Sequence, residues 1–135
     1  MRVLVDSSVW ISFFRGRDTE SAVSDALDYL LAGDEAVVND VILSELLPAM
    51  RVRNETKNAD LLGYVRTLPL ATDWEGIRAL QETCLRHGIN KVGIPDLMIA
   101  QQAIVENLPL FSLDAHFRLL AQQVPLRLWP QERQS

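Results

Sequence analysis

The sequence has few of the residues from which thiol and zinc sites are built. It contains one cysteine, Cys84, and two histidines. A single thiol excludes a disulfide framework within the chain, and three such ligands are too few for a structural zinc site. This cysteine usage predicts a cytoplasmic protein, because disulfides belong to oxidising compartments.

Long apolar runs and a surplus of positive charge are also missing. No apolar stretch approaches the roughly 20 residues of a membrane span, so no membrane association is expected. The residues after Met1 have neither the apolar core nor the small-residue cleavage site of a secretory signal. The net charge of −5 is unlike that of a protein that coats nucleic acid with its own basic surface. A phosphate-bearing substrate would therefore have to be received by metal ions rather than by protein charge.

The apolar residues that are present predict one domain over residues 1–130, with a frayed tail at 131–135. Hydrophobic residues make up 48% of the 135 residues, which is enough for a buried core. Short apolar segments predict strands at 2–5, 36–38, 68–71, 108–111 and 126–128. Amphipathic patterns predict helices between them, including one over 56–67. The alternation is typical of a three-layer α/β/α fold with a mostly parallel sheet of four to five strands.

Four acidic residues stand where a parallel α/β fold gathers its active site. Asp6 and Asp114 follow predicted strands, Asp96 opens a predicted helix, and Glu45 lies about one turn into another helix. In such folds, ligands bind beyond the carboxyl ends of the strands. Two carboxylates ~4 Å apart repel each other by about 4 kcal/mol at an effective dielectric constant of ~20. The cluster therefore predicts a cation site, and an all-oxygen ligand set suits Mg²⁺ or Mn²⁺.

Each of these acids also has a structural interpretation that the sequence leaves open. Asp96 and Asp114 are residues of the type that caps helices, and Asp6 is a possible turn residue. Glu45 has no comparable structural explanation, because it lies inside a largely apolar helix.

Other polar residues near these positions are predicted to have structural roles. Asp40 and Asp73 are predicted to cap the helices that follow them. His116 is predicted to be a surface residue of a first helical turn. Pro48 is expected to kink the helix that carries Glu45, because its ring opposes a carbonyl of the preceding turn.

The segments around the four acids resemble those of a known family. The segments VLVDSSVWISFFRG, LSELL, IPDLMIA and FSLDAHF are similar, in this order and spacing, to the PIN-domain ribonucleases, and within them to the VapC-type toxins of bacterial toxin–antitoxin pairs. The resemblance covers essentially the whole chain. It implies a Mg²⁺-dependent endoribonuclease that forms a homodimer and is inhibited by a small VapB-type antitoxin, which also binds operator DNA.

The resemblance also implies roles for the acids. Asp6, Asp96 and Asp114 would hold the principal metal, directly or through water. Glu45 would orient or deprotonate the attacking water, and it would itself reach the metal through water. Whether one or two metals act, and which RNA is cut, stays open at this point.

Two serines match polar positions of the family. Ser8 lies two residues after the first acid, where a hydroxyl supports the metal or its water. Ser112 stands where the family usually has threonine, a change that keeps the hydroxyl. Pro48 departs from the family pattern close to Glu45.

Basic residues are the candidates for contact with RNA, because phosphate contacts supply most of the non-specific affinity for nucleic acids. A solvated charged face is the alternative interpretation for most of them. The candidates are Arg15, Arg17, Arg51, Arg53, Lys57 and Lys91.

Three other functions compete with the nuclease interpretation. A phosphotransferase of the haloacid-dehalogenase kind, which would act as a phosphatase, needs a second Asp two residues after the first, and this position is Ser8. A response-regulator receiver domain needs an adjacent acidic pair and a late lysine, and no lysine follows Lys91. A PIN-like module that binds RNA or a partner without cutting is the third, although all four acids are present.

Overall fold

The computed structural model describes residues 1–16 and 21–130. Arg17 and the predicted tail at 131–135 lie outside the described residues. The strands are β1 (Val3–Val5), β2 (Ala36–Val38), β3 (Arg66–Thr67) and β4 (Leu110–Phe111). The helices are α1 (Ser7–Arg15), α2 (Ser21–Ala32), α3 (Asp40–Val52), α4 (Thr56–Gly63), α5 (Trp74–Arg86), α6 (Ile94–Val105) and α7 (Ala115–Ala121).

The strands form a parallel sheet with the order β3-β2-β1-β4. The predicted strand at 126–128 contributes a single parallel bridge, between Leu128 and Leu110 beside β4. Every residue of β1 and β2 is buried, as expected for central strands that are covered on both faces. The structure therefore confirms the predicted mostly parallel sheet.

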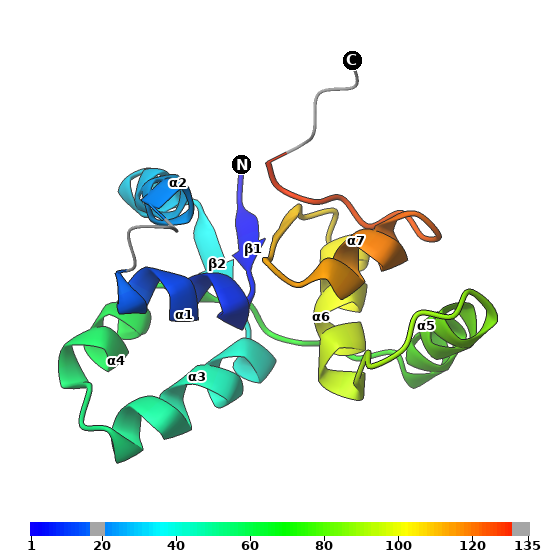
Figure 1. The fold of residues 1–135 in the computed structure, drawn as a ribbon, viewed down its shortest axis with the longest axis horizontal. Helices are drawn as coiled ribbons and strands as arrows, with labels where there is room; N and C mark the ends of the chain where they lie inside the picture. The colour runs from blue at the N-terminus through cyan, green and yellow to red at the C-terminus, as the bar shows by residue number, and fades with distance from the viewer. Residues whose placement is uncertain (17–20, 131–135) are drawn as a thin grey trace.

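Helices cover both faces of this sheet (Figure 1). The chain moves outward from β1 to β2 to β3, and α1 to α4 lie together on one side of the strands. It then crosses back to β4, and α5, α6 and α7 lie on the other side. Because crossovers between parallel strands are right-handed, helices fall on opposite faces of a sheet when the chain reverses the direction in which it adds strands. The predicted three-layer α/β/α architecture is confirmed.

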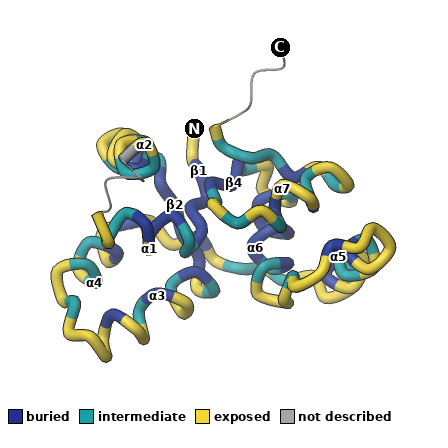
Figure 2. Tube along the Cα trace, in the orientation of Figure 1, coloured by how far each residue is buried: buried dark blue, intermediate teal, exposed yellow. Residues whose placement is uncertain are grey.

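The hydrophobic core lies between these layers and is centred on the strands (Figure 2). Trp10 of α1 is fully buried, and its indole N–H donates to the Val5 carbonyl at 3.1 Å. The Trp10 ring stacks on Phe14 with ring centroids 5.9 Å apart. These contacts fix α1 against the end of β1, where the first acid of the predicted site lies. Among the described residues, no helix is both long and apolar enough to cross a bilayer.

Two local predictions need correction. The helix predicted over 56–67 ends at Gly63, and Arg66–Thr67 pairs with β2, so the strand comes before the predicted 68–71. Both residues of β3 are exposed at the sheet edge, so apolar alternation does not mark them. The cap of α3 is Asn39 rather than Asp40: the Asn39 side chain accepts a hydrogen bond from the backbone N–H of Ile42.

The start of α5 packs very closely against α6, and Gly76 permits this approach. A Cβ at this position would lie 2.6 Å from the Gln101 amide nitrogen and 2.9 Å from an Asp73 carboxylate oxygen. Gln101 cannot move away freely, because its amide donates to the Asp73 carbonyl and accepts from the Asp73 N–H. Asp73 occupies the predicted N-cap position of α5, although its side chain makes no capping hydrogen bond.

We expect Gly76→Ala to destabilise the protein by ~1–3 kcal/mol, the usual cost of forcing an extra carbon into a packed site. Chemical denaturation would measure this change. Gly63→Ala is the matched control, because a Cβ there would meet nothing within 4 Å. Gly63→Ala should be neutral or stabilising by up to about 1 kcal/mol. Equal stabilities of the two variants would contradict the close packing of α5 on α6.

Candidate active site

The strand register places the first acid next to the last strand. Val5 pairs with Phe111, so Asp6 and Ser112, the next residues, lie side by side at the carboxyl edge of the sheet. The Asp6 N–H donates to the Phe111 carbonyl at 2.9 Å. Asp6 is 4% exposed and caps α1, since its side chain accepts from the Ser8 N–H.

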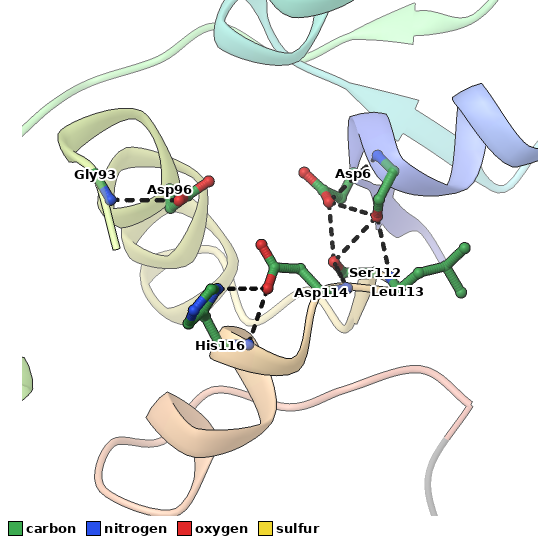
Figure 3. Close-up of polar contacts among 8 residues, drawn as sticks. Asp6, Gly93, Asp96, Ser112, Leu113, Asp114 and His116 are labelled. Atoms are coloured by element: carbon green, nitrogen blue, oxygen red, sulfur yellow. Dashed lines mark hydrogen bonds and ion pairs between the residues drawn. The ribbon is translucent and has the colours of Figure 1, made fainter. Parts of the chain in front are cut away.

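Two serine hydroxyls hold the Asp6 carboxylate in place (Figure 3). The Ser8 hydroxyl donates to Asp6 Oδ2 at 2.7 Å, and the Ser112 hydroxyl donates to the same oxygen at 2.9 Å. The same hydroxyl oxygens accept the backbone N–H groups of Leu113 and Asp114, each at 3.0 Å. Both serines therefore tie the loop after β4 to the first acid. The described hydrogen bonds of this carboxylate all end on Oδ2.

Asp114 combines the two roles that its sequence position suggested. Its Oδ1 accepts from the backbone N–H of His116 at 2.9 Å, so the residue caps α7. The His116 ring nitrogen Nδ1 lies 2.6 Å from the same oxygen. The prediction that His116 is a surface residue is only partly right, because its side chain is 33% exposed and contacts the acid. The signal for this contact was its place two residues after a capping Asp.

Asp96 is not the N-cap of α6, which is Gly93; it lies in the first turn at N3. Its Oδ2 accepts from the Gly93 N–H at 3.4 Å. Burial raises the pKa of Asp96 most, and the negative charges of Asp6 and Asp114 raise it further. The Gly93 hydrogen bond and the His116 charge lower it, but the net direction is upward.

Glu45 lies about one turn into α3 and keeps part of its side chain exposed. Desolvation raises the pKa of Glu45 most, followed by the charges of Asp6 and Asp96, whereas a hydrogen bond with the Ser7 side chain lowers it. Among the four acids, electrostatic interactions thus link Glu45 to Asp6 and Asp96, and Asp96 to Asp6 and Asp114.

The arrangement fits a hydrated divalent cation. In Figure 3 the carboxylates of Asp6, Asp96 and Asp114 point into a common space from three different elements. Within residues 1–16 and 21–130, no three His, Cys, Asp or Glu side chains lie close enough together to surround an ion directly. Mg²⁺ keeps several waters and takes only one or two carboxylates directly, so such spacing is compatible with it. The donors are all oxygen, as hard cations require.

A hollow of about 190 Å³ adjoins Glu45 between α1, α3 and the start of α4. Of the five described residues named as RNA-contacting candidates, Arg15 and Arg53 line this hollow. Arg51, Lys57 and Lys91 are exposed and are not among its lining residues.

The sequence profile of the PIN domain family matches residues 3–123. The chain belongs to the PIN domain family. This membership excludes the phosphotransferase and receiver-domain alternatives, whose folds are different, and confirms the family resemblance of the four acidic segments. It leaves the non-cutting PIN module as the remaining competitor.

The chain is also similar to individual relatives. A protein named Ribonuclease VapC from Rickettsia bellii (strain RML369-C) is 29% identical over 122 residues, covering 84% of this chain and 86% of the relative. The fold matches VapBC2 from Rickettsia felis, solved bound to a promoter DNA fragment, with a TM-score of 0.73 and 17% identity over 95% of this chain and 97% of that one. It also matches VapC20 from Mycobacterium tuberculosis, described as a sarcin–ricin loop cleaving toxin, with a TM-score of 0.61 and 16% identity over 93% and 98% of the two chains.

The raised pKa of Asp96 has a consequence for stability. A carboxyl group whose pKa is higher in the folded than in the unfolded chain binds more protons when folded, so its ionisation destabilises the fold as the pH rises above the ordinary value of about 3.9. We expect Asp96→Asn to raise the melting temperature in metal-free buffer at pH 7, because it removes the charge and keeps an oxygen for Gly93. The gain should shrink as the pH falls and vanish below about pH 4.

Thermal melts between pH 4 and pH 8 with EDTA would measure this effect. Glu82→Gln is the matched control, because Glu82 is an exposed acid on α5 and its replacement should leave the melting temperature unchanged. Adding Mg²⁺ should stabilise the wild type more than Asp96→Asn, because only the wild type keeps the full ligand set. A lower melting temperature for Asp96→Asn in EDTA at pH 7 would contradict the electrostatic account.

Proposed function

We propose that this protein is a Mg²⁺-dependent (or Mn²⁺-dependent) endoribonuclease that acts as the toxin of a VapBC-type toxin–antitoxin pair. The observation that carries the proposal is the set of three carboxylates, from three elements, that face a common space at the carboxyl edge of a PIN-domain sheet. The similarity to a protein named Ribonuclease VapC supports the reaction. The solved VapBC complexes among the structural neighbours support the partner.

Asp6, Asp96 and Asp114 are the proposed metal ligands, directly or through water. When bound there, the metal would supply Lewis-acid chemistry: it would lower the pKa of a water and offset the charge that builds on the phosphate. Ser8 and Ser112 orient Asp6 by donating to its Oδ2, which directs Oδ1 toward the ligand role. His116 holds Asp114 from the other side of the site through Oδ1.

Glu45 is the proposed group that orients or deprotonates the attacking water. Its raised pKa makes it a stronger proton acceptor than an ordinary carboxylate, which suits a general base near neutral pH. A contact of Glu45 with the metal through water is part of the same proposal.

The remaining partners follow from the family. A VapB-type antitoxin and a homodimer are proposed on the strength of the resemblance to VapC-type toxins and of the VapBC complexes among the structural neighbours. The cytoplasm stays the predicted compartment, since the RNA substrates and the antitoxin of such a pair would be met there. A PIN module that binds RNA without cutting is the competitor that the following experiment separates.

We expect the purified wild type to cleave RNA with Mg²⁺ and to lose cleavage with EDTA. Asp96→Asn should slow cleavage by at least roughly 100-fold, as for other residues that act as a catalytic unit. Sequencing of RNA 5′ ends after brief induction of each protein would give the cleavage maps. Because Asp96→Asn is expected to be at least as stable as the wild type in EDTA, its loss of activity cannot be attributed to unfolding.

Two outcomes would contradict the proposal. If the two cleavage maps coincide, the cuts come from another nuclease. If the wild type binds RNA equally well in Mg²⁺ and EDTA and produces no cuts of its own, the protein is a binding module.

We further expect Arg15 and Arg53 to contact RNA phosphates beside Glu45. Their joint replacement by alanine should raise KM with little change in kcat, and the slope of the salt dependence of binding should fall by about one for each arginine that neutralises a phosphate. Steady-state kinetics and binding at several salt concentrations would measure both effects. Arg86→Ala, at the far end of α5, is the control and should change neither. If the two-site variant matches Arg86→Ala, the hollow is not part of the RNA path.

A further inference from the structure

A buried chain of amide hydrogen bonds connects the two faces of the sheet close to the proposed active site. Asn39 directly follows β2, caps α3 and is fully buried. Its Nδ2 donates to Oε1 of Gln102, in the C-terminal half of α6, at 2.8 Å. The Nε2 of Gln102 donates to the carbonyl of Pro69, in the connection between β3 and α5, at 3.0 Å.

The direction of each hydrogen bond in this series is fixed by the two backbone groups at its ends, the Ile42 N–H and the Pro69 carbonyl. The backbone N–H of Ile42 can only donate, and it donates to Oδ1 of Asn39 at 2.9 Å. The carbonyl of Pro69 can only accept, and it accepts a hydrogen bond from Nε2 of Gln102. Turning either amide over would bring like groups face to face, so each side chain has one orientation. A buried network with all its members satisfied is rigid, because every alternative leaves a polar group without a partner.

The two side chains belong to the elements that carry two of the proposed catalytic acids. Glu45 lies six residues after Asn39 on α3, and Asp96 lies six residues before Gln102 on α6. Each acid is thus about 9 Å along its helix from the hydrogen bond, at 1.5 Å per residue. Helices α3 and α6 belong to opposite sides of the sheet and also contact each other, so the interactions between them help to set the distance between these acids.

We propose that Asn39 and Gln102 are positioning residues whose hydrogen bond sets α3 against α6, and with it the placement of Glu45 relative to Asp96. The inference rests on the proposed nuclease function. Their bond acts on the active site through the two helices and touches neither substrate nor metal. Because a misplacement of about 1 Å can cost a factor of roughly 100 in rate, a small change in the relative placement of these helices is sufficient to impair cleavage.

The chain itself offers a matched control in the neighbouring glutamine. Gln101 is also buried, at 8% exposed against 5% for Gln102, and it also makes two hydrogen bonds. Both of its bonds go to Asp73 at the start of α5, which carries none of the four acids. Gln101→Met and Gln102→Met therefore remove the same groups from the same helix. Only Gln102→Met removes the hydrogen bond between α6 and the residue that caps α3.

The experiment compares Gln101→Met and Gln102→Met in two assays. We expect Gln102→Met to reduce kcat for RNA cleavage at least roughly threefold below that of Gln101→Met, with KM of the two within about twofold. In the absence of RNA, the Mn²⁺ concentration that gives half of the maximal increase in melting temperature should also be at least roughly threefold higher for Gln102→Met. Unless both measurements separate the two variants, the positioning role is overturned.

A second variant keeps the test decisive where Gln102→Met does not fold. Asn39→Ser retains a side-chain oxygen to cap α3 but has no amide to reach Gln102, and serine is a good N-cap. It should show the same two changes relative to Gln101→Met. The proposed nuclease function is judged separately, by the wild type and Asp96→Asn. If these behave as proposed while Gln102→Met or Asn39→Ser matches Gln101→Met, only the positioning role fails.

Discussion

Parallel pairing of β1 with β4 brings Asp6 alongside Ser112, and the geometry of the site follows from this contact. The two strands are far apart in the sequence, and only their register decides which residues meet at the carboxyl edge. Ser8 and Ser112 then donate to one carboxylate oxygen while their own oxygens accept the N–H groups of the loop that leads to Asp114. A shift of one residue in the register would move Ser112 away from its place beside Asp6.

The acids serve both the fold and the site, and the two roles favour different charge states. Asp6 and Asp114 cap the helices that follow them, so the positive ends of two helix dipoles support their negative charge. Asp96 and Glu45 have raised pKa values, because both lose solvation and face the charge of Asp6. A divalent cation would relieve the repulsion between these carboxylates. The net charge of −5 thus includes four charges gathered at a single place.

Much of the fold and of the candidate site could be predicted from the sequence. Asp6 and Asp114 follow short apolar strands and Asp96 lies in the first turn of a helix, and chain topology brings such positions to one edge of the sheet, so no side-chain contact had to be known. Short β3 was misplaced because exposed edge residues carry no apolar pattern, and Asp40 was preferred to Asn39 as a cap although both residue types cap well. The contacts of Asn39 with Gln102 and of His116 with Asp114 could not be predicted in detail, because they depend on how buried or partly buried side chains turn in the folded chain.

Binding of a divalent cation by these acids is the central claim about this protein. The most direct measurement is a titration of Mn²⁺ into the protein without RNA, with the free ion followed by its electron paramagnetic resonance signal. We expect saturable uptake by the wild type and an affinity at least roughly tenfold weaker for Asp96→Asn. Equal affinities for the two proteins, or no uptake by the wild type, would contradict it.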